Sequence, residues 1–323
     1  MAEILVTGGA GFISSVVAKK LLDKGEKVVA VDNLNDYYDI RLKEQRLAFL
    51  KKYKNFTFHQ FDIEKKEKTE LIFDAHNFKS VINLAARAGV RYSLENPHVY
   101  VTTNITGTLN LLEAMSKRNI KQFILASSSS LYAGEGLPFN ETLEVNKPIS
   151  PYAATKKAAE MMAYTYHSIY DIDTAVLRYF TVYGPYGRPD MSYFRFIKWI
   201  DEGIPIELFG DGTQTRDFTY VDDIAEGTIK SLDIKGYEII NLGGGKEPVS
   251  IKYMIEKIEE YLGKKAEINY REFQKTDMMH TGADISKAKK VLGWQPETGI
   301  DEGLKKTVDW YKENRSLLKE III

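Results

Sequence analysis

Cysteine is absent from this 323-residue sequence, and histidine occurs only five times. Without a thiol, the chain cannot use a cysteine nucleophile, a disulfide, a thiolate zinc site or an iron–sulfur cluster. The five histidines are scattered, so they do not indicate a histidine-rich metal site either. We therefore predict that the protein uses no metal.

The sequence also lacks an excess of charge of one sign, because 44 Lys and Arg residues against 45 Asp and Glu give a formal net charge of -1. Nucleic acids and anionic membrane surfaces are bound through accumulated Lys and Arg, so we expect no nucleic acid and no membrane partner. No run of roughly 18 apolar residues is present. The strand-like residues 4–6 are not preceded by the basic and apolar regions of a secretory signal peptide. We therefore expect a cytoplasmic protein.

The composition is ordinary for a folded protein: 44% of the residues are hydrophobic and 28% are charged, which excludes a disordered or collagen-like chain. In the first half, short apolar runs alternate with segments of helical period. We predict strands at residues 4–6, 28–31, 56–61, 81–84, 123–126 and 175–179, and helices at 13–24, 38–52, 99–118 and 152–170. The strands are too continuously apolar for a one-faced antiparallel sheet. The expected fold class is therefore α/β, with a Rossmann-type doubly wound parallel sheet.

Glycine and proline interrupt this pattern after about residue 180. We interpret residues 1–180 as the domain that contains the sheet and residues 181–323 as a smaller C-terminal substrate domain. Within the smaller domain we predict helices at residues 250–262 and 301–312. A segment near residues 218–242 is expected to return to the sheet.

A glycine-rich turn, TGGAGFIS at residues 7–14, joins the first strand to the first helix. In that setting backbone N–H groups and the helix N-terminus face a pyrophosphate. Gly8 would permit the tight turn, and Gly11 would let the phosphates approach closely. An ordinary strand–helix turn is the alternative. Ser14 stands where a third glycine is usual, so we expect the helix to be spread slightly from the sheet.

Asp32 ends the second strand, about 20 residues beyond the glycine turn, where a carboxylate accepts hydrogen bonds from the adenine ribose hydroxyls. Its charge would repel a 2′-phosphate, which favours NAD over NADP as the cofactor. The alternative is that Asp32 and Asn33 simply start a turn.

Tyr152 and Lys156 are four residues apart, on one face of a predicted helix. A phenol with a pKa of about 10 is a poor base at neutral pH, but a neighbouring ammonium and an oxidised nicotinamide favour the phenolate. Serines 127–130 end the fifth strand, at the sheet edge where open α/β sheets bind ligands. A serine hydroxyl there can bond the reacting oxygen. Each pattern alone occurs by chance, but their combination with the glycine turn and Asp32, in chain order, indicates a functional site.

With these motifs in this order, the sequence resembles the extended short-chain dehydrogenase/reductase family of nucleotide-sugar enzymes over essentially its whole length. The matching segments are residues 7–13, 62–63, 84–86, 104–108, 128, 152–156, 178–180, 211–218, 220–223 and 292–296. The resemblance implies that residues 1–180 bind NAD and residues 181–323 bind a UDP-sugar. It also implies a homodimer that packs through the helices containing residues 104–118 and 152–170.

The resemblance also implies roles for individual residues. Ser128, Tyr152 and Lys156 would be catalytic. NAD contacts are implied for Gly8, Gly11, Phe12, Ile13, Asp32, Asn33, Asp62, Ile63, Leu84, Ala85, Ala86, Asn104, Tyr152, Lys156 and Tyr179. Substrate contacts are implied for Ser128, Ser129, Ser130, Thr181, Arg188, Arg216 and Asp277, with Arg216 by the pyrophosphate and Asp277 near the uridine.

The strand-end serines bear on the reaction that the resemblance implies. In this family the first step is oxidation of the sugar C4 hydroxyl, with Tyr152 taking the proton and NAD the hydride. Related dehydratases and decarboxylases carry acidic residues at positions matching Ser129 or Ser130, where this chain has hydroxyls. The difference favours 4-epimerisation, in which the ketone turns over and takes the hydride back on its other face, regenerating NAD.

Residues 181–191, TVYGPYGRPDM, and residues 88–93, AGVRYS, are similar to those of UDP-glucuronate 4-epimerases. The hydroxyls of Thr181, Ser129 and Ser130 would donate hydrogen bonds to a C5 carboxylate, and such charge-assisted bonds are roughly twice as strong as neutral ones. We therefore expect an isomerase that converts UDP-glucuronate to UDP-galacturonate. The alternatives are a UDP-glucose or UDP-N-acetylglucosamine 4-epimerase, a UDP-glucuronate decarboxylase and a non-catalytic NAD-binding regulator.

Three positions allow more than one interpretation or none. Arg188 would bind the sugar carboxylate or the phosphates, or would only belong to a turn of the substrate domain. Arg87 follows the fourth strand and would either approach the pyrophosphate or form a surface salt bridge. Ala133 replaces a usual glycine after Tyr132, and nothing in the sequence explains this change.

Overall fold

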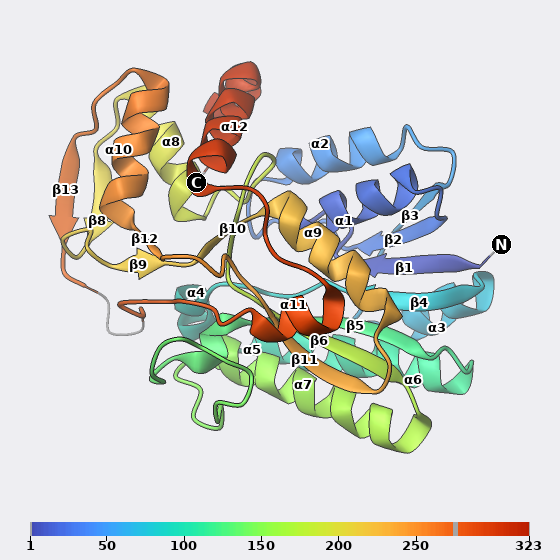
Figure 1. Cartoon of the computed structure of the whole chain (residues 1–323). Coiled ribbons are helices and arrows are strands. Elements are labelled where there is room, and N and C mark those ends of the chain that lie inside the picture. The colour runs from blue at the N-terminus through green and yellow to red at the C-terminus, as the bar shows by residue number, and fades with distance from the viewer. Residues whose placement is uncertain (1, 274–276, 323) are drawn as a thin grey trace.

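The computed structural model describes residues 2–273 and 277–322. Its larger part is a seven-stranded parallel sheet covered by helices on both faces (Figure 1). In spatial order the strands are β11 (Tyr237–Leu242), β6 (Asp173–Tyr179), β5 (Gln122–Ser128), β4 (Phe78–Asn83), β1 (Glu3–Thr7), β2 (Val28–Asp32) and β3 (Phe56–Gln60). The predicted Rossmann-type doubly wound sheet is confirmed.

The strand order reverses between β1 and β4, which are parallel neighbours in the sheet. In doubly wound sheets, ligands bind at this reversal, in the crevice beyond the carboxyl ends of the strands. The glycine-rich turn follows β1 and residues 84–87 follow β4. The fold therefore brings both segments to the crevice.

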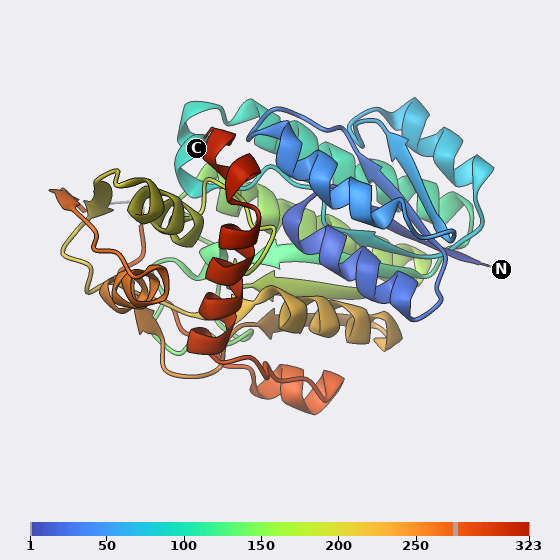
Figure 2. The same cartoon turned by 90° about the horizontal axis from the view of Figure 1, so that it is seen from above.

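Helices α1 (Phe12–Asp23), α2 (Ile40–Leu50), α9 (Val221–Lys230) and α11 (Ser286–Leu292) lie on one face of the sheet, and α3 (Lys66–Ala75), α6 (Thr108–Lys117) and α7 (Pro151–Tyr170) lie on the other (Figures 1 and 2). Each face has its own apolar core, with Val17 and Ile224 on one side and Leu111 and Ala159 on the other. Inner strands such as β2 are buried from both sides and largely apolar, whereas the edge strand β3, with the sequence FTFHQ, has no fully buried residue.

The helix predicted at residues 99–118 is divided into α5 (His98–Tyr100), the π-helix η1 (Val101–Gly107) and α6. Gly107 ends η1 so close to Ile63 that a Cβ at this position would lie 2.6 Å from the Ile63 side chain. The wider turn also contains the buried Asn104. Short π-helical segments inside helices are frequent at functional sites.

The smaller part packs around a separate apolar core that includes Phe194, Met254 and Leu304. Its elements are α8 (Ser192–Glu202), β8 (Ile206–Phe209), α10 (Ile251–Leu262), β13 (Ile268–Arg271), α12 (Ile300–Glu313) and α13 (Arg315–Glu320), with the short strand pairs β7 (Thr181–Tyr183) with β10 (Phe218–Tyr220) and β9 (Thr215–Arg216) with β12 (Val249–Ser250). The chain returns to the sheet as β11, which pairs with β6. The domain boundary at residue 180 stays a prediction.

Three short helices complete the description: α4 (Val90–Glu95), the 3-10 helix η2 (Ser129–Tyr132) and η3 (Ser231–Asp233). Across residues 2–273 and 277–322, none of the helices has both the length and the apolar character needed to span a membrane.

Candidate active site

The glycine-rich turn is tight and lies directly against the chain that follows β4. Gly8 has a φ of +67°, and a Cβ there would lie 2.9 Å from the Cα and the backbone nitrogen of Ala85. Its carbonyl oxygen accepts hydrogen bonds from the Gly11 N–H, at 2.7 Å, and from the Ser14 hydroxyl. Ser14 thus closes the turn, and the expected spreading of the helix from the sheet stays a prediction. The turn leads into α1, whose first N–H groups have no partner within the helix.

Asp32 is buried beside this turn. Its carboxylate accepts hydrogen bonds from the N–H of Ala10, at 3.1 Å, and of Leu34, at 2.8 Å. The bond to Leu34 shows that Asp32 starts a turn after β2, which was the alternative interpretation of this residue. The bond to Ala10 also joins the end of β2 to the glycine-rich turn. Next to it, the Asn33 amide donates to the Asp62 carboxylate at 2.7 Å. Each carboxylate oxygen of Asp32 retains a lone pair for a further donor such as a ribose hydroxyl.

Tyr152 and Lys156 project from the first turns of α7. The helix begins after Ser150, whose hydroxyl accepts from the Ala153 N–H. The Lys156 ammonium donates to the Ala126 carbonyl of β5 at 2.8 Å. Burial lowers the pKa of Lys156 to about 8, although the carboxylate of Glu160 acts in the opposite direction. Lys156 is thereby held behind the end of the strand that carries Ser128.

Tyr152 shares the site with Ser128 and Arg188. Burial raises the pKa of the Tyr152 phenol, whereas hydrogen bonding to Ser128 and the charge of Arg188 lower it. The tyrosine ring also packs edge-on against Tyr100, with 6.1 Å between ring centroids. Ser128, Tyr152 and Lys156, the predicted catalytic residues, are therefore gathered at one edge of the sheet.

A buried polar network that the sequence did not reveal supports these residues from behind. Glu160 accepts from both the Nε and Nη2 of Arg178, at 2.9 and 2.8 Å, and from the Ser127 hydroxyl at 2.6 Å. Arg178 also donates to Tyr132, whose hydroxyl donates to Asn241. Burial would lower the pKa of Arg178, but Glu160 raises it above its ordinary value. The network joins α7 to β5, β6 and β11.

Asn104 fixes the loop after β4 to α7. Its side chain accepts from the Arg87 N–H at 2.9 Å and donates to the Arg87 carbonyl and to the Thr155 hydroxyl, at 3.1 and 3.0 Å. The Arg87 guanidinium donates to the Asn35 side chain at 3.0 Å, and it forms no ion pair with any residue that the structure describes. Its approach to the pyrophosphate stays a prediction.

The hydroxyls predicted to bind substrate lie at the same sheet edge. Ser128 ends β5 in register with Tyr179 of β6, so Ser130 and Thr181 each follow two residues beyond a paired position. The Ser130 N–H donates to the Ser128 hydroxyl at 3.1 Å. Arg188 is paired with Asp190 at 2.5 Å and lies over the Tyr37 ring, 5.6 Å from its centroid.

Two arginines lie near Asp277, another residue predicted to contact the substrate. Arg91 of α4 pairs with Asp277 at 2.6 Å, and Arg216 donates to the carbonyls of Thr215 and Met279. Burial lowers the pKa of Arg216, Asp277 raises it, and Arg91 lowers it further. Two guanidinium groups around one carboxylate leave an excess of positive charge, which suits a pyrophosphate. Arg91 is not among the predicted substrate contacts, although it lies in the segment 88–93 that carries the resemblance.

The model of the NAD dependent epimerase/dehydratase family matches residues 4–243. The chain belongs to this family. A UDP-glucuronate 4-epimerase from Thermodesulfobacterium geofontis is 60% identical over 321 residues, which cover 99% of each protein. Protein CapI from Staphylococcus aureus is 42% identical over 96% of this chain and 98% of that protein.

Solved structures of two epimerases are also similar to this chain over nearly its whole length. The crystal structure of UDP-glucuronic acid 4-epimerase from Bacillus cereus in complex with UDP-glucuronic acid and NAD is 39% identical, with a TM-score of 0.90 over 96% of this chain and 99% of that one. UDP-glucose 4-epimerase from Thermotoga maritima, solved with UDP-glucose, is 34% identical, with a TM-score of 0.88 over 97% of this chain and 99% of that one.

The residues present fit the NAD on which this family depends. Side chains at Gly8 and Gly11 would fill the concave turn, since a Cβ at Gly11 would lie 2.8 Å from the Gly8 carbonyl oxygen. The turn thus leaves room for a pyrophosphate at the start of α1. Asp32 lies beside this turn, where its carboxylate can accept hydrogen bonds from the ribose hydroxyls. The negative charge of the carboxylate would repel a 2′-phosphate. These features agree with NAD as the cofactor.

Other residues predicted to bind the cofactor are placed as follows. Phe12 and Ile63 are buried, Ile13 is half-buried, and Leu84, Ala85 and Ala86 follow β4, with the Ala85 N–H bonded to the Thr7 hydroxyl. Tyr179 differs, because its buried hydroxyl bonds Thr228 of α9 at 2.7 Å. Its side chain is therefore turned into the core, and its contact with the cofactor stays a prediction.

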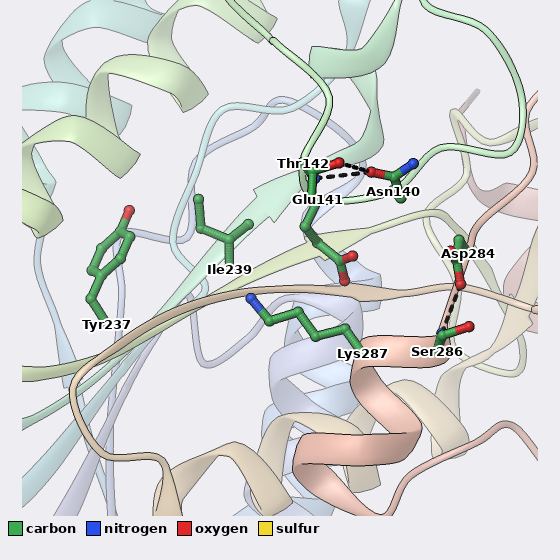
Figure 3. Close-up of a pocket in the computed structure, with 8 residues that line it drawn as sticks. All are labelled: Asn140, Glu141, Thr142, Tyr237, Ile239, Asp284, Ser286 and Lys287. Atoms are coloured by element: carbon green, nitrogen blue, oxygen red, sulfur yellow. Dashed lines mark hydrogen bonds between the residues drawn. The ribbon is translucent and has the colours of Figure 1, made fainter.

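A separate hollow of about 530 Å³ lies along the outer edge of β11 (Figure 3). It is lined by Asn140, Glu141, Thr142, Tyr237, Ile239, Asp284, Ser286 and Lys287. None of the predicted site residues is among them. The Glu141 carboxylate accepts from the Asn241 N–H at 2.8 Å, which covers part of the exposed edge of the strand.

Proposed function

We propose that this protein is an NAD-dependent UDP-glucuronate 4-epimerase, which interconverts UDP-glucuronate and UDP-galacturonate through a 4-keto sugar. The observation that carries the proposal is the combination of neutral hydroxyls after Ser128 with the Arg188 guanidinium, whose charge lowers the pKa of the Tyr152 phenol. This combination provides donors for a sugar carboxylate without an acid in the strand end. The 60% identical relative named UDP-glucuronate 4-epimerase supports the same assignment.

Tyr152 is the acid and base of the reaction. It takes the proton of the sugar C4 hydroxyl during oxidation and returns a proton to the same oxygen after the ketone has turned over. Lys156 supports the charged phenolate through its ammonium, and Ser128 donates a hydrogen bond to the reacting oxygen. Bound NAD supplies the hydride acceptor and donor. Because oxidation and reduction cancel, the turnover consumes no cofactor.

The sugar carboxylate is held by Ser129, Ser130, Thr181 and Arg188. Hydroxyl donors and a guanidinium satisfy an ionised acceptor. Arg188 donates to Asp190 through Nε and Nη2 and would add a charge-assisted bond through Nη1. The 4-keto sugar is a β-keto acid that can lose CO₂. Donors that keep the carboxylate out of alignment with the ketone π system suppress this loss. Arg91 and Arg216 bind the pyrophosphate, and Asp277 contacts the uridine.

We also propose that the protein acts as a homodimer, because apolar side chains such as Val101 and Met161 are about half exposed on η1 and α7, the helices expected to pair. The cytoplasmic location expected from the sequence stays a prediction.

The test is to incubate the purified protein with UDP-glucuronate, without added cofactor, and to identify the products by NMR. UDP-galacturonate is the expected product, and its formation without added NAD would establish that the cofactor is resident. UDP-xylose or its 4-keto precursor would instead identify a decarboxylase. Turnover of UDP-glucose or UDP-N-acetylglucosamine, with none of UDP-glucuronate, would contradict the role given to the hydroxyls and Arg188.

A further inference from the structure

Arg46 of α2 is fully buried, and each of its five N–H donors has a partner. Nε and Nη2 donate to the Tyr186 carbonyl, at 3.0 and 2.7 Å, and Nη2 also donates to the Gly187 carbonyl at 3.1 Å. Nη1 donates to the Ala10 carbonyl at 3.1 Å and to the Tyr38 hydroxyl at 2.6 Å. None of these acceptors is a carboxylate. The guanidinium therefore acts as a fork between neutral oxygens of the backbone and one phenol.

The backbone acceptors belong to the two segments that the proposed reaction needs. Ala10 lies in the glycine-rich turn that would hold the dinucleotide, and Tyr186 and Gly187 directly precede Arg188. The single side chain of Arg46 thus forms hydrogen bonds both to the glycine-rich turn and to the loop that precedes Arg188.

The loop before Arg188 is held in one conformation that depends on these bonds. Tyr186 has a φ of +60°, which an L-residue with a side chain rarely adopts. At Gly187 a Cβ would lie 1.9 Å from the Tyr193 hydroxyl, so the backbone passes close to α8. Conformations of this kind persist only where the surroundings over-determine them. Two Arg46 bonds to the Tyr186 carbonyl supply that constraint.

Several positively charged side chains lie near Arg46 and the glycine-rich turn. Lys43, one turn earlier on α2, is buried with its ammonium donating to the Asn35 carbonyl. Burial lowers the pKa of Lys43 to about 8, Asp32 raises it, and Arg46, Arg87 and Arg188 lower it further. A buried positive charge that Asp32 offsets only in part is costly. An anionic ligand at the glycine-rich turn would relieve this cost.

We propose that Arg46 is a positioning residue that couples the dinucleotide turn to the Arg188 loop and thereby holds Arg188 against the sugar carboxylate. The proposal rests on the proposed function. It assigns Arg46 no contact with substrate, so its effect on turnover passes through Arg188.

The first test is the Arg46→Lys variant, which keeps the charge but loses the planar fork. We expect the variant to retain its NAD and its kcat, while KM for UDP-glucuronate rises about tenfold, because binding that is equal in the ground and transition states affects KM alone. Arg41→Lys is the matched control on the same helix, since Arg41 bonds Asp39 and Glu320 instead. Its KM should be unchanged.

The second test is a double-mutant cycle with Arg188→Ala. If Arg46 acts through Arg188, Arg46→Lys adds no further increase of KM once Arg188 is removed. A purely structural role would multiply KM equally in both backgrounds and would overturn the proposal. Should Arg46→Lys not fold, Tyr38→Phe removes a single acceptor of the fork and should raise KM by a smaller factor, again only when Arg188 is present.

The two proposals fail in different ways. If the unmodified protein does not turn over UDP-glucuronate, the proposed function is wrong whatever the variants do. If the unmodified protein is active and both Arg46→Lys and Tyr38→Phe leave KM unchanged, only the coupling through Arg46 is wrong.

Discussion

Burial acts on Tyr152 and Lys156 in opposite directions, since it raises the pKa of the phenol and lowers that of the ammonium to about 8. Both changes favour the neutral forms of the two side chains. The protein by itself therefore opposes the charged pair that the reaction uses. Glu160, Ser128 and Arg188 offset part of this effect, and the positive nicotinamide of oxidised NAD would offset more.

Replacing Tyr152 with Phe tests the acid and base role at the scale of one atom. The variant keeps the ring against Tyr100 but lacks the hydroxyl, so we expect turnover of UDP-glucuronate to fall by at least about 100-fold, the usual contribution of such a group. The NAD content per protomer should be unchanged. NMR of the products and release of the cofactor on denaturation measure the two quantities. Tyr170→Phe, at the exposed end of α7, is the control, and full activity in Tyr152→Phe would refute the assignment.

Lys156 should make the fold less stable while it makes the site active. Its pKa falls from 10.5 to about 8 on folding, which corresponds to about 3 kcal/mol at about 1.4 kcal/mol per pKa unit. Because the unfolded chain holds the proton more tightly, this cost is complete below pH 8 and disappears as the pH rises toward 10.5. Lys156→Met also loses the bond to the Ala126 carbonyl, worth about 1 kcal/mol.

We therefore expect Lys156→Met to be inactive and yet more stable than the unmodified protein by about 2 kcal/mol at pH 7. The advantage should shrink between pH 8 and pH 10. Urea denaturation at several pH values measures it, with the exposed Lys305→Met on α12 as the control. A variant that is less stable at pH 7 would show that the buried ammonium is fully compensated.

At the scale of an element, α1 is flanked by a matched pair of glycines, Gly8 in the turn before the helix and Gly25 in the turn after it. Gly8 and Gly25 both have a positive φ, but a Cβ at Gly8 would collide with Ala85, whereas a Cβ at Gly25 would meet nothing within 4 Å. Substitution by Ala should therefore cost each site about 1 kcal/mol of backbone strain. Only Gly8→Ala should also shift the turn and lose most of its bound NAD. Equal NAD content in the two variants would argue against the turn as the pyrophosphate site.

The elements of the sheet could be predicted because their apolar runs are buried on both faces, and the exceptions have local causes. β4 begins at Phe78, three residues before its predicted start, because the exposed Lys79 interrupts the apolar run. The charged residues 65–68 hid α3, whose buried face consists of Thr69, Ile72 and Phe73. Nothing in the helical period of residues 99–118 indicates that part of it winds as a π-helix.

The site was predictable where spacing along the chain determines geometry, as for Tyr152 and Lys156 on one helix face. Contacts between distant segments could not be predicted from one sequence. The ion pair of Arg91 with Asp277 joins residues 186 positions apart in the chain, and that of Glu160 with Arg178 joins a helix to a strand, so no regular spacing indicates either contact. Arg46 stands among the polar residues of an ordinary helix, and only the fold reveals that all its donors are used.

At the scale of the whole molecule, α6 and α7 lie side by side on the outer face of the sheet (Figure 1). Val101 of η1 is 46% exposed and Met161 of α7 is 50% exposed. The proposed homodimer would cover the outward face of η1 and α7, which contact each other and carry these exposed apolar side chains. A second copy of the chain can cover this face symmetrically, with the same helices contributed by each protomer.

A charge placed on this face should separate the protomers of the proposed homodimer. In Met161→Glu a carboxylate would face its symmetry mate or the apolar surface around it, and such a buried like-charge contact costs several kcal/mol. We expect the mass measured by light scattering to fall from that of a dimer to that of a monomer. Leu71→Glu, on α3 at a position that is 65% exposed, should remain dimeric.

Because a dimer interface stabilises the fold by mass action, the melting temperature of the unmodified protein should rise with protein concentration, while that of Met161→Glu should not. An unmodified protein that is monomeric at micromolar concentration would contradict the assembly, and a dimer that survives Met161→Glu would place its interface on another face.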